Sequence, residues 1–219
     1  MRRRRKRNAN EFTSRFDTAI EGLRLTERAG RIRDLFRDSL RLVTKPKGDQ
    51  FQMVCETRIG GCPDLPRKVE WPVSSEGPMA FIAQLNLTEV PDFPAKKTLP
   101  RKGMLLFFYA PYSLNWGSDP SYRDRWSVMY FDDPHANIAS RDYPEDLPEE
   151  YRYTPCSVKF KRQMTLPSLD SPLVEGLRLD DEMLDNYYDL ILAMDSIQGF
   201  DENASAHRIF GHPDQIRRN

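Results

Sequence analysis

The N-terminal part of the chain spaces its apolar residues as a helix does. From Asn10 onward, apolar residues follow one another at steps of four, four and three positions, which places them on one helix face. This face consists of Phe12, Phe16, Ile20 and Leu23. A second stretch predicts another helix, whose apolar stripe consists of Ile32, Leu35, Phe36 and Leu40. Residues 1–9 offer charge without an apolar anchor, and we expect them to form a disordered arm.

The middle of the chain contains shorter apolar runs, with the length and alternation typical of strands. The predicted strands cover residues 51–56, 79–87, 104–109, 127–131 and 156–164. Residues 104–109 form a nearly continuous apolar run, which indicates a strand that is buried on both faces. The chain has 17 prolines, and these separate the strands because proline cannot donate a hydrogen bond to a sheet.

The last part of the chain predicts one further helix, over residues 180–196. Asp180, Asp181 and Glu182 suit its first turn, where free N–H groups and the helix dipole favour anions. Its expected buried face consists of Leu184, Tyr187, Tyr188, Ile191 and Leu192. A short strand running into a turn is predicted for residues 206–213. Helices first, mostly antiparallel strands in the middle and a late helix indicate the α+β class.

Length and composition limit the possible classes of protein. The 219 residues suit one large domain or two small ones, and we interpret residues 10–219 as a single domain. No apolar run approaches the ~18–20 residues that span a bilayer, so no membrane span is predicted. Three cysteines are too few for a disulfide framework. Together with the lack of an apolar stretch after the basic N-terminus, they predict a cytoplasmic protein.

Charge is unevenly distributed, although the formal net charge is zero. Residues 1–50 hold 15 basic and 7 acidic side chains, so the remainder of the chain is acidic. The basic head could dock on its own acidic body or reach for an acidic partner such as nucleic acid or anionic lipid. The basic cluster itself consists of Arg2, Arg3, Arg4, Arg5, Lys6 and Arg7. No aromatic residue interleaves with it, so base stacking is not indicated, and a solvated tail is the favoured interpretation.

A segment rich in glycine and proline lies between the predicted strands over residues 51–56 and 79–87. It reads Thr-Arg-Ile-Gly-Gly-Cys-Pro-Asp-Leu-Pro over residues 57–66, followed by Trp71 and Pro72. Paired glycines permit positive φ or a close backbone approach, and prolines hold φ near one value. Trp71 supplies an apolar anchor. We therefore expect a rigid, ordered loop.

This segment and three later ones resemble the YwqG-like family, a group whose function is unknown. The first block consists of Thr57, Arg58, Ile59, Gly60, Gly61, Pro63, Leu65, Pro66, Trp71 and Pro72. The second block is residues 81–87. The third consists of Leu99, Pro100, Gly103, Leu105, Phe107 and Phe108, and the fourth of His207, Gly211 and Pro213. The resemblance covers about residues 50–216 and implies two antiparallel sheets built from an intertwined repeat.

The chain departs from the family pattern near its C-terminus. His212 stands where the family usually has tyrosine, and Arg217 where it has glutamine. Family members generally continue beyond this point into second copies of the Leu-Gln-Leu and Gly-x-Leu-x-Phe-Phe strands. The resemblance therefore implies a C-terminally incomplete domain with a partial repeat. Two hypotheses follow: a truncated product, or a chain whose open sheet edge pairs with a partner or with itself.

Four side chains could carry chemistry. Gln84 and Asn86 share one face of a predicted strand, where they could line a pocket or satisfy backbone groups of the proline-rich loop; we favour the second role. His207 could act as a general base or ligand, but a structural role is favoured. Cys62, on a glycine turn, could be a nucleophile, and the family pattern leaves its position open.

The favoured function is an intracellular binding or interaction module without a catalytic site, a cofactor or a metal. Its partner would be a protein or a small molecule. The candidate binding residues are Arg58, Gly60, Gly61, Trp71, Gln84, Asn86 and His207. The alternative is a small hydrolase or transferase with His207 as its base. A weaker alternative is nucleic-acid association through the basic N-terminal arm.

Overall fold

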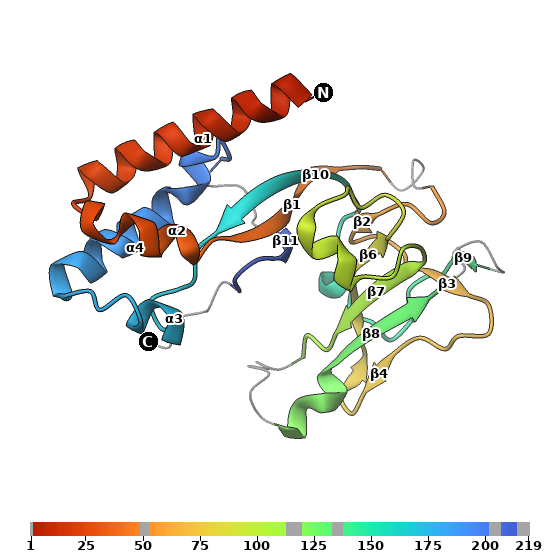
Figure 1. Cartoon of the computed structure of the whole chain (residues 1–219). Coiled ribbons are helices and arrows are strands. Elements are labelled where there is room, and N and C mark those ends of the chain that lie inside the picture. The colour runs from red at the N-terminus through yellow and green to blue at the C-terminus, as the bar shows by residue number, and fades with distance from the viewer. Residues whose placement is uncertain (1, 49–52, 113–119, 133–137, 202–206, 214–219) are drawn as a thin grey trace. The chain divides into compact units, whose positions relative to one another are not determined.

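The computed structural model describes residues 2–48, 53–112, 120–132, 138–201 and 207–213, with side chains from residue 11 onward. Its contacts divide the chain into two compact units (Figure 1). The helical unit comprises Met1–Leu42 and Lys161–Asn219, and the sheet unit comprises Val43–Phe160. We describe each unit by itself, and the expectation of a single domain over residues 10–219 stays a prediction.

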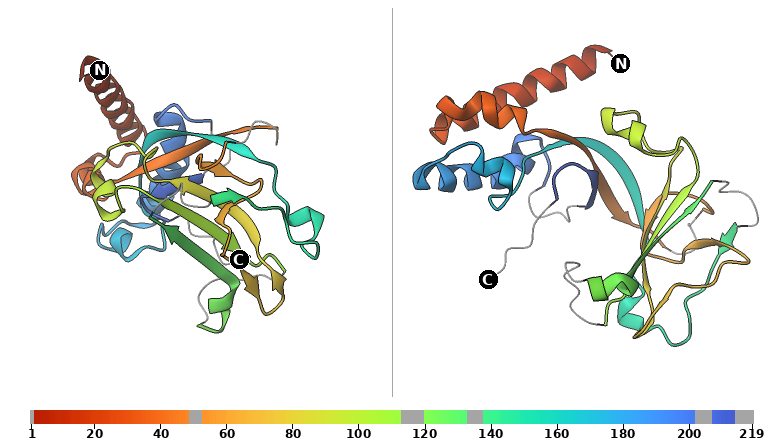
Figure 2. Two further views of the ribbon diagram at one scale, coloured as in Figure 1. Left: turned by 90° about the vertical axis from the view of Figure 1, so that its right-hand side faces the viewer. Right: turned by 60° about the horizontal axis from the view of Figure 1, so that its bottom comes forward.

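In its described residues, the helical unit combines four α-helices with one end of a seven-stranded sheet. Its helices are α1 (Arg2–Gly22), the 3-10 helix η1 (Thr26–Arg28), α2 (Ala29–Asp34), α3 (Pro172–Glu175) and α4 (Asp181–Ile197). Its strands are β11 (His207–Phe210) and parts of β1 (Arg37–Pro46) and β10 (Cys156–Thr165), in the order β11-β1-β10. Helices α1 and α4 lie side by side (Figure 2). The core between the helices includes Phe16, Ile20, Ile32, Tyr187 and Leu190.

Helix α1 confirms the predicted apolar face and extends further than predicted. Phe16 and Ile20 are buried, and Phe12 and Leu23 pack against them. The helix begins at Arg2, so residues 2–9 are helical here, where the sequence analysis expected a disordered arm. Arginine, lysine and alanine are good helix formers, and a helix anchored by Phe16 and Ile20 can propagate through them at little further cost.

The second predicted helix is much shorter than its apolar stripe suggested. Helix α2 ends at Asp34, and strand β1 starts at Arg37. Leu40, which we assigned to the helix stripe, is buried in β1 instead, opposite Ile209 of β11. A short apolar pattern fits helix and strand about equally well. Pairing with strands that lie far away in the sequence therefore determines that this segment is a strand.

Helix α4 was predicted almost to the residue. The side chain of Asp180 caps it by accepting a hydrogen bond from the backbone N–H of Met183 at 2.9 Å. Tyr187, Leu190 and Met194 form its buried row, at the three- and four-residue spacing of one helix face. Leu192 lies off this row and is exposed, so its predicted burial is wrong.

The buried hydroxyl of Tyr187 is expected to make the folded chain less stable in alkaline solution. Burial raises the pKa of its hydroxyl, which donates a hydrogen bond to the carbonyl of Pro167 at 3.0 Å. Above about pH 10 the unfolded chain loses this proton while the folded chain keeps it, so the free energy of unfolding falls as pH rises. We expect Tyr187→Phe to flatten this decline in urea unfolding measured on both sides of that pH. Tyr188→Phe, on the less buried neighbour, is the control, and an equal flattening there would contradict the assignment.

The sheet unit is an antiparallel sheet with loops and short helices around it. Its main strands are the first part of β10, then β2 (Arg58–Ile59), β6 (Ala80–Asn86), β7 (Met104–Tyr109) and β8 (Trp126–Phe131), in that order. Two further pairs are β3 (Asp64–Pro66) with β9 (Ile138–Ser140) and β4 (Val73–Ser74) with β5 (Gly77–Pro78). The 3-10 helices are η3 (Pro94–Thr98), η4 (Pro120–Arg125) and η5 (Glu149–Tyr151). The neighbouring strands of this sheet pair antiparallel, which confirms the α+β class.

Strands β6, β7, β8 and β10 confirm four predicted strands, and two details differ. Met104, Leu106 and Phe108 are buried while the residues between them are only half-buried, so β7 is not fully covered on both faces as predicted. The predicted strand over residues 51–56 is wrong for residues 53–56, the described part of this range. Residues 51 and 52 lie outside the described part, and the following residues form a turn in which Cys55 has a φ of 66°.

In the described part of the chain, no helix combines the length and the apolar character that crossing a bilayer requires.

Candidate functional site

The glycine–proline segment enters the sheet unit through the two-residue strand β2. Arg58 and Ile59 pair with Gln84 and Ala83 of β6 on one side, and with β10 on the other. Gly60 and Gly61 follow, with φ values of 68° and 72°, a left-handed conformation in which glycine has no steric penalty. Their backbone N–H groups donate to the carbonyls of Ile82 and Tyr153, each at 2.8 Å. The segment is therefore held by the sheet and by the loop before β10.

Gly60 also lies too close to that loop for any larger residue. A Cβ atom at this position would be 2.4 Å from the carbonyl oxygen of Thr154 and 2.9 Å from that of Tyr153. Both obstacles are backbone atoms, which cannot swing aside as a side chain can. Close backbone approach was one predicted reason for the paired glycines, and Gly60 has both this and a positive φ.

A buried ion pair lies beneath this loop. Arg58 is 2% exposed and Asp64, at the start of β3, is 1% exposed. Nη2 of Arg58 lies 2.9 Å from Oδ1 of Asp64. Arg58 also donates to the carbonyl of Met53 at 3.2 Å and to that of Cys62. One guanidinium group thus connects the chain at Met53, Cys62 and Asp64, and among the described residues the carboxylate of Asp64 compensates its charge.

Asp64 is held in turn by a network of amides. Its Oδ2 accepts from the backbone N–H of Cys55 at 2.7 Å and from Nε2 of Gln84 at 2.6 Å. Oε1 of Gln84 accepts from the backbone N–H of Asp64 at 2.9 Å, and Nε2 also donates to the carbonyl of Glu56 at 2.8 Å. Asn86 donates to the carbonyl of Cys55 at 2.8 Å. The favoured interpretation of these two amides, that they satisfy the loop backbone, agrees with these contacts.

Asp64 itself was missed in the sequence. The available signal was a charged residue enclosed by Pro63 and Leu65 in a loop expected to be rigid, since a buried charge must have a partner. The sequence does not indicate that this partner is Arg58, six positions earlier.

Trp71 is also held in place by contacts within the sheet unit. Its indole N–H donates to the carbonyl of Met79 at 2.8 Å, and its ring meets that of Phe108 edge-on at a centroid distance of 5.5 Å. Phe108 belongs to the core of the sheet unit. Trp71 therefore anchors the loop to the buried face of β7, as the sequence analysis proposed.

Beside the ion pair lies a pocket of about 790 Å³. Arg58, Cys62 and Asp64 contribute to its lining, together with Tyr143 and Tyr153. Three of its charged side chains are basic and three acidic: Lys47, Arg58, Arg152, Asp64, Asp142 and Glu149. The described lining is thus polar, with equal numbers of basic and acidic side chains.

The wall of the pocket is fixed by further contacts. Arg152 donates from Nε to the carbonyl of Leu147 at 3.0 Å and stacks over the ring of Tyr143 at 5.6 Å. Lys47 pairs with both carboxylate oxygens of Glu56 at 2.9 Å. Burial, and to a smaller extent the neighbouring tyrosines, raises the pKa of Tyr153, so its hydroxyl is protonated at neutral pH and can donate. These side chains present fixed donors, acceptors and ring faces.

Chemically, this arrangement favours binding over bond-making. The described lining contains one thiol, Cys62, and no histidine to activate it. No group of three or more potential metal-ligating side chains occurs among the described residues. The lining can therefore donate and accept hydrogen bonds, while a nucleophile paired with a base is missing from its described members.

Six of the seven predicted site residues come together in the sheet unit, and His207 does not belong to it. His207 is exposed on β11 of the helical unit and therefore lies apart from the other six. Only Arg58 of the seven lines the pocket; the two glycines, the two amides and Trp71 support the loop beside it. The basic cluster at residues 2–7 lies outside the part of the chain whose side chains are described.

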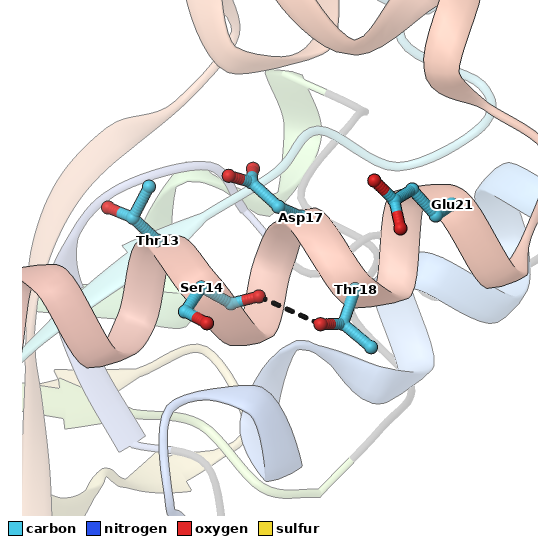
Figure 3. A pocket seen from close by; sticks show the side chains of 5 residues that line it. All are labelled: Thr13, Ser14, Asp17, Thr18 and Glu21. Atoms are coloured by element: carbon cyan, nitrogen blue, oxygen red, sulfur yellow. Dashed lines mark hydrogen bonds between the residues drawn. The ribbon is translucent and has the colours of Figure 1, made fainter.

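A second hollow, on the surface of α1, has no comparable construction. Its lining side chains all come from this one helix: Thr13, Ser14, Asp17, Thr18 and Glu21 (Figure 3). The hydroxyl of Thr18 donates back to the carbonyl of Ser14 at 3.0 Å, and Asp17 pairs with Arg33 of α2. A ligand there would meet the surface of one helix, on which Asp17 and Thr18 already have partners.

Comparison with known proteins gives two findings. No curated protein matches the chain. One family model, described as a domain of unknown function (DUF1963), matches residues 57–219. The match begins at Thr57, the first residue of the glycine–proline segment, and includes Arg58, Asp64 and most of the pocket lining. Because it extends over most of the chain, the protein belongs to the family defined by this domain of unknown function, DUF1963.

Proposed function

We propose that the sheet unit is a non-catalytic binding module whose pocket beside Arg58 and Asp64 accepts a small, uncharged or zwitterionic polar ligand. The observation that carries this proposal is the buried Arg58–Asp64 pair, which gives the pocket a fixed, polar floor. A volume of about 790 Å³ falls within the range of small-molecule sites in proteins.

The rigidity of the pocket supports a binding role. Arg58 and Asp64 are immobilised by contacts with Met53, Cys62 and Gln84, and the left-handed glycines hold the loop above them. A preformed site loses less entropy on binding than one that must first become ordered. A loop tied down by this many buried polar contacts is consistent with such a site.

The charge balance of the lining supports the class of ligand. The described lining contributes three basic and three acidic side chains, and several already have partners within the unit. Among these described residues, neither a strongly anionic nor a strongly cationic ligand finds an excess of opposite charge. A ligand with paired charges, or with hydroxyl and amide groups alone, would match these donors and acceptors and the flat faces of Tyr143 and Tyr153.

Two finer assignments accompany the proposal. Within the family, we infer that the chain is YwqG-like, supported by the four motif blocks that occur in that family's order. We also infer a cytoplasmic location, which the three free cysteines support because reducing compartments keep thiols free.

The thiol of Cys62 offers a direct test, because it lines the pocket while Cys156, equally half-buried, does not. The full chain is alkylated with iodoacetamide in the presence of neutral probes (N-acetylglucosamine, N-acetylalanine amide), zwitterionic amino acids, citrate or spermidine. We expect at least one neutral or zwitterionic probe to slow alkylation of Cys62 and to leave Cys156 unchanged. Mass spectrometry of the two peptides measures both rates.

A space-filling variant tests whether the probe occupies the pocket. Ser140 is exposed and lines the pocket, so Ser140→Trp should weaken binding of the protective probe by about tenfold or more, ~1.4 kcal/mol. The control is Ser75→Trp, an exposed serine outside the pocket. Protection only by citrate or only by spermidine would contradict the proposed ligand class. No protection by any probe, with both variants folded, would contradict the binding function.

A further inference from the structure

Strand β8 lies at an edge of the sheet and lacks two common protections against association, charge and proline. Among the described residues it pairs with β7 alone, at the end of the strand order (Figure 1). Its sequence, Trp-Ser-Val-Met-Tyr-Phe, contains no charged residue and no proline. Natural edge strands usually carry such residues, because unpaired N–H and C=O groups are a template for another chain. The opposite edge, β11, has His207 and Arg208.

The hydrogen bonds of the β7–β8 pair show which residues of β8 face outward. The backbone N–H of Ala110 donates to the carbonyl of Arg125 at 2.7 Å, and the register continues with Tyr109 opposite Trp126. Backbone groups of successive residues alternate between the two sides of a strand. Ser127 and Met129 therefore direct their backbone groups toward β7. The backbone groups of Trp126, Val128 and Tyr130 point to the free edge.

These same three residues expose their side chains. Trp126 is 55% exposed, Val128 49% and Tyr130 43%, and they share one face of the sheet because they are two positions apart. Directly beside them on β7 lie the half-buried Tyr109, Phe107 and Leu105. An apolar stripe on an open strand thus coincides with the outward-facing backbone. Exposed apolar patches of this kind are typical of interaction surfaces.

We propose that the occupant of this edge is β8 of a second copy of the chain, paired antiparallel about Val128. In that register Val128 faces its counterpart, and Trp126 faces Tyr130 of the second copy, on both sides of a two-fold axis. All three outward-facing residues then meet outward-facing residues, whereas a slip by one residue would set them against groups already bonded to β7. The aromatic–aliphatic–aromatic order is its own complement, as an isologous interface requires.

A second copy fits this strand better than an unrelated partner does. The strand has no charged side chain that would select a partner of opposite charge, so its specificity rests on backbone pairing and on the symmetric apolar order. Aromatic cross-strand pairs stabilise antiparallel strands. The interface is separate from the proposed ligand site, because none of the three residues lines the pocket, and the two proposals can fail independently.

Sedimentation velocity of the full chain tests the proposal. We expect a concentration-dependent equilibrium between monomer and dimer, and we expect Val128→Lys to raise the dissociation constant by about a hundredfold or more, because it places two like charges opposite each other. The control is Val73→Lys, which changes an exposed valine on β4 of the same unit and should leave the equilibrium unchanged. Circular dichroism checks that both variants are folded.

If Val128→Lys fails to fold, the fluorescence of the unmodified chain still tests whether the chain dimerises through β8. The fluorescence of Trp126 should shift to shorter wavelength as concentration rises, since dimerisation buries its ring, and Trp126→Phe should abolish the shift. A strictly monomeric chain at its highest soluble concentration would overturn the proposal. So would a dimer that survives Val128→Lys, or growth into open-ended oligomers instead of a closed pair.

Discussion

Replacing Asp64 with asparagine is expected to lower the free energy of unfolding of the sheet unit by about 3–5 kcal/mol, the usual cost of removing one partner of a buried pair. Asparagine keeps the size of the side chain and can still accept from the N–H of Cys55. The substitution leaves a positive charge on Arg58, which is only 2% exposed. In the described structure, no other anion lies close to this charge. The cost therefore comes from an uncompensated buried charge and not from a cavity.

Urea unfolding followed by tryptophan fluorescence, to which Trp71 of the same unit contributes, measures this effect. A double-mutant cycle with Arg58→Met isolates the ion pair. We expect each single variant to be strongly destabilised and the double variant to lose clearly less than the two costs together. Glu182→Gln, which breaks the solvent-exposed pair with Arg24, should cost less than about 1 kcal/mol. Additive losses at positions 58 and 64 would show that the pair is not coupled.

Replacing Gly60 with alanine is expected to destabilise the same unit by about 2–5 kcal/mol, because two costs combine. A left-handed φ of 68° is unfavourable for any residue with a Cβ atom. That Cβ would also approach the carbonyl oxygen of Thr154 to 2.4 Å, so the loop before β10 must move away. This loop carries the carbonyl of Tyr153 that binds Gly61, so the displacement would also loosen the pocket wall.

A matched glycine separates the two costs. Gly199 has a φ of 73°, and a Cβ atom built there would meet nothing within 4 Å. Gly199→Ala should therefore show the conformational cost alone, about 1–2 kcal/mol. Thermal unfolding by circular dichroism compares the two variants. Equal losses at positions 60 and 199 would mean that the close approach to Thr154 contributes nothing.

The Gly60→Ala variant also bears on the proposed function. If the pocket beside Arg58 is preformed, a folded Gly60→Ala chain should bind the protective probe more weakly, because its wall has shifted. A chain that binds unchanged would place the ligand elsewhere in the sheet unit.

Local patterns in the sequence were sufficient for the elements that depend on their own residues. Helix α4 follows from the acidic cap at Asp180 and its apolar row, and the buried face of α1 follows from the spacing of Phe16 and Ile20. The strands containing Gln84, Leu106 and Val128 follow from apolar runs of strand length. Even the role of Gln84 in satisfying the loop backbone could be anticipated, since a buried amide beside a rigid loop needs partners.

Contacts between distant segments decided the rest. Leu40 fits a helix stripe, but pairing with Ile209 makes it part of a strand, and Cys55 lies in a turn because Asp64 binds its N–H group. The partnership of Arg58 and Asp64, the pocket and the open edge of β8 likewise depend on how strands are ordered. An amino-acid pattern encodes the period of an element, whereas the choice of neighbour is made by the free energy of packing the whole chain, which no local window contains.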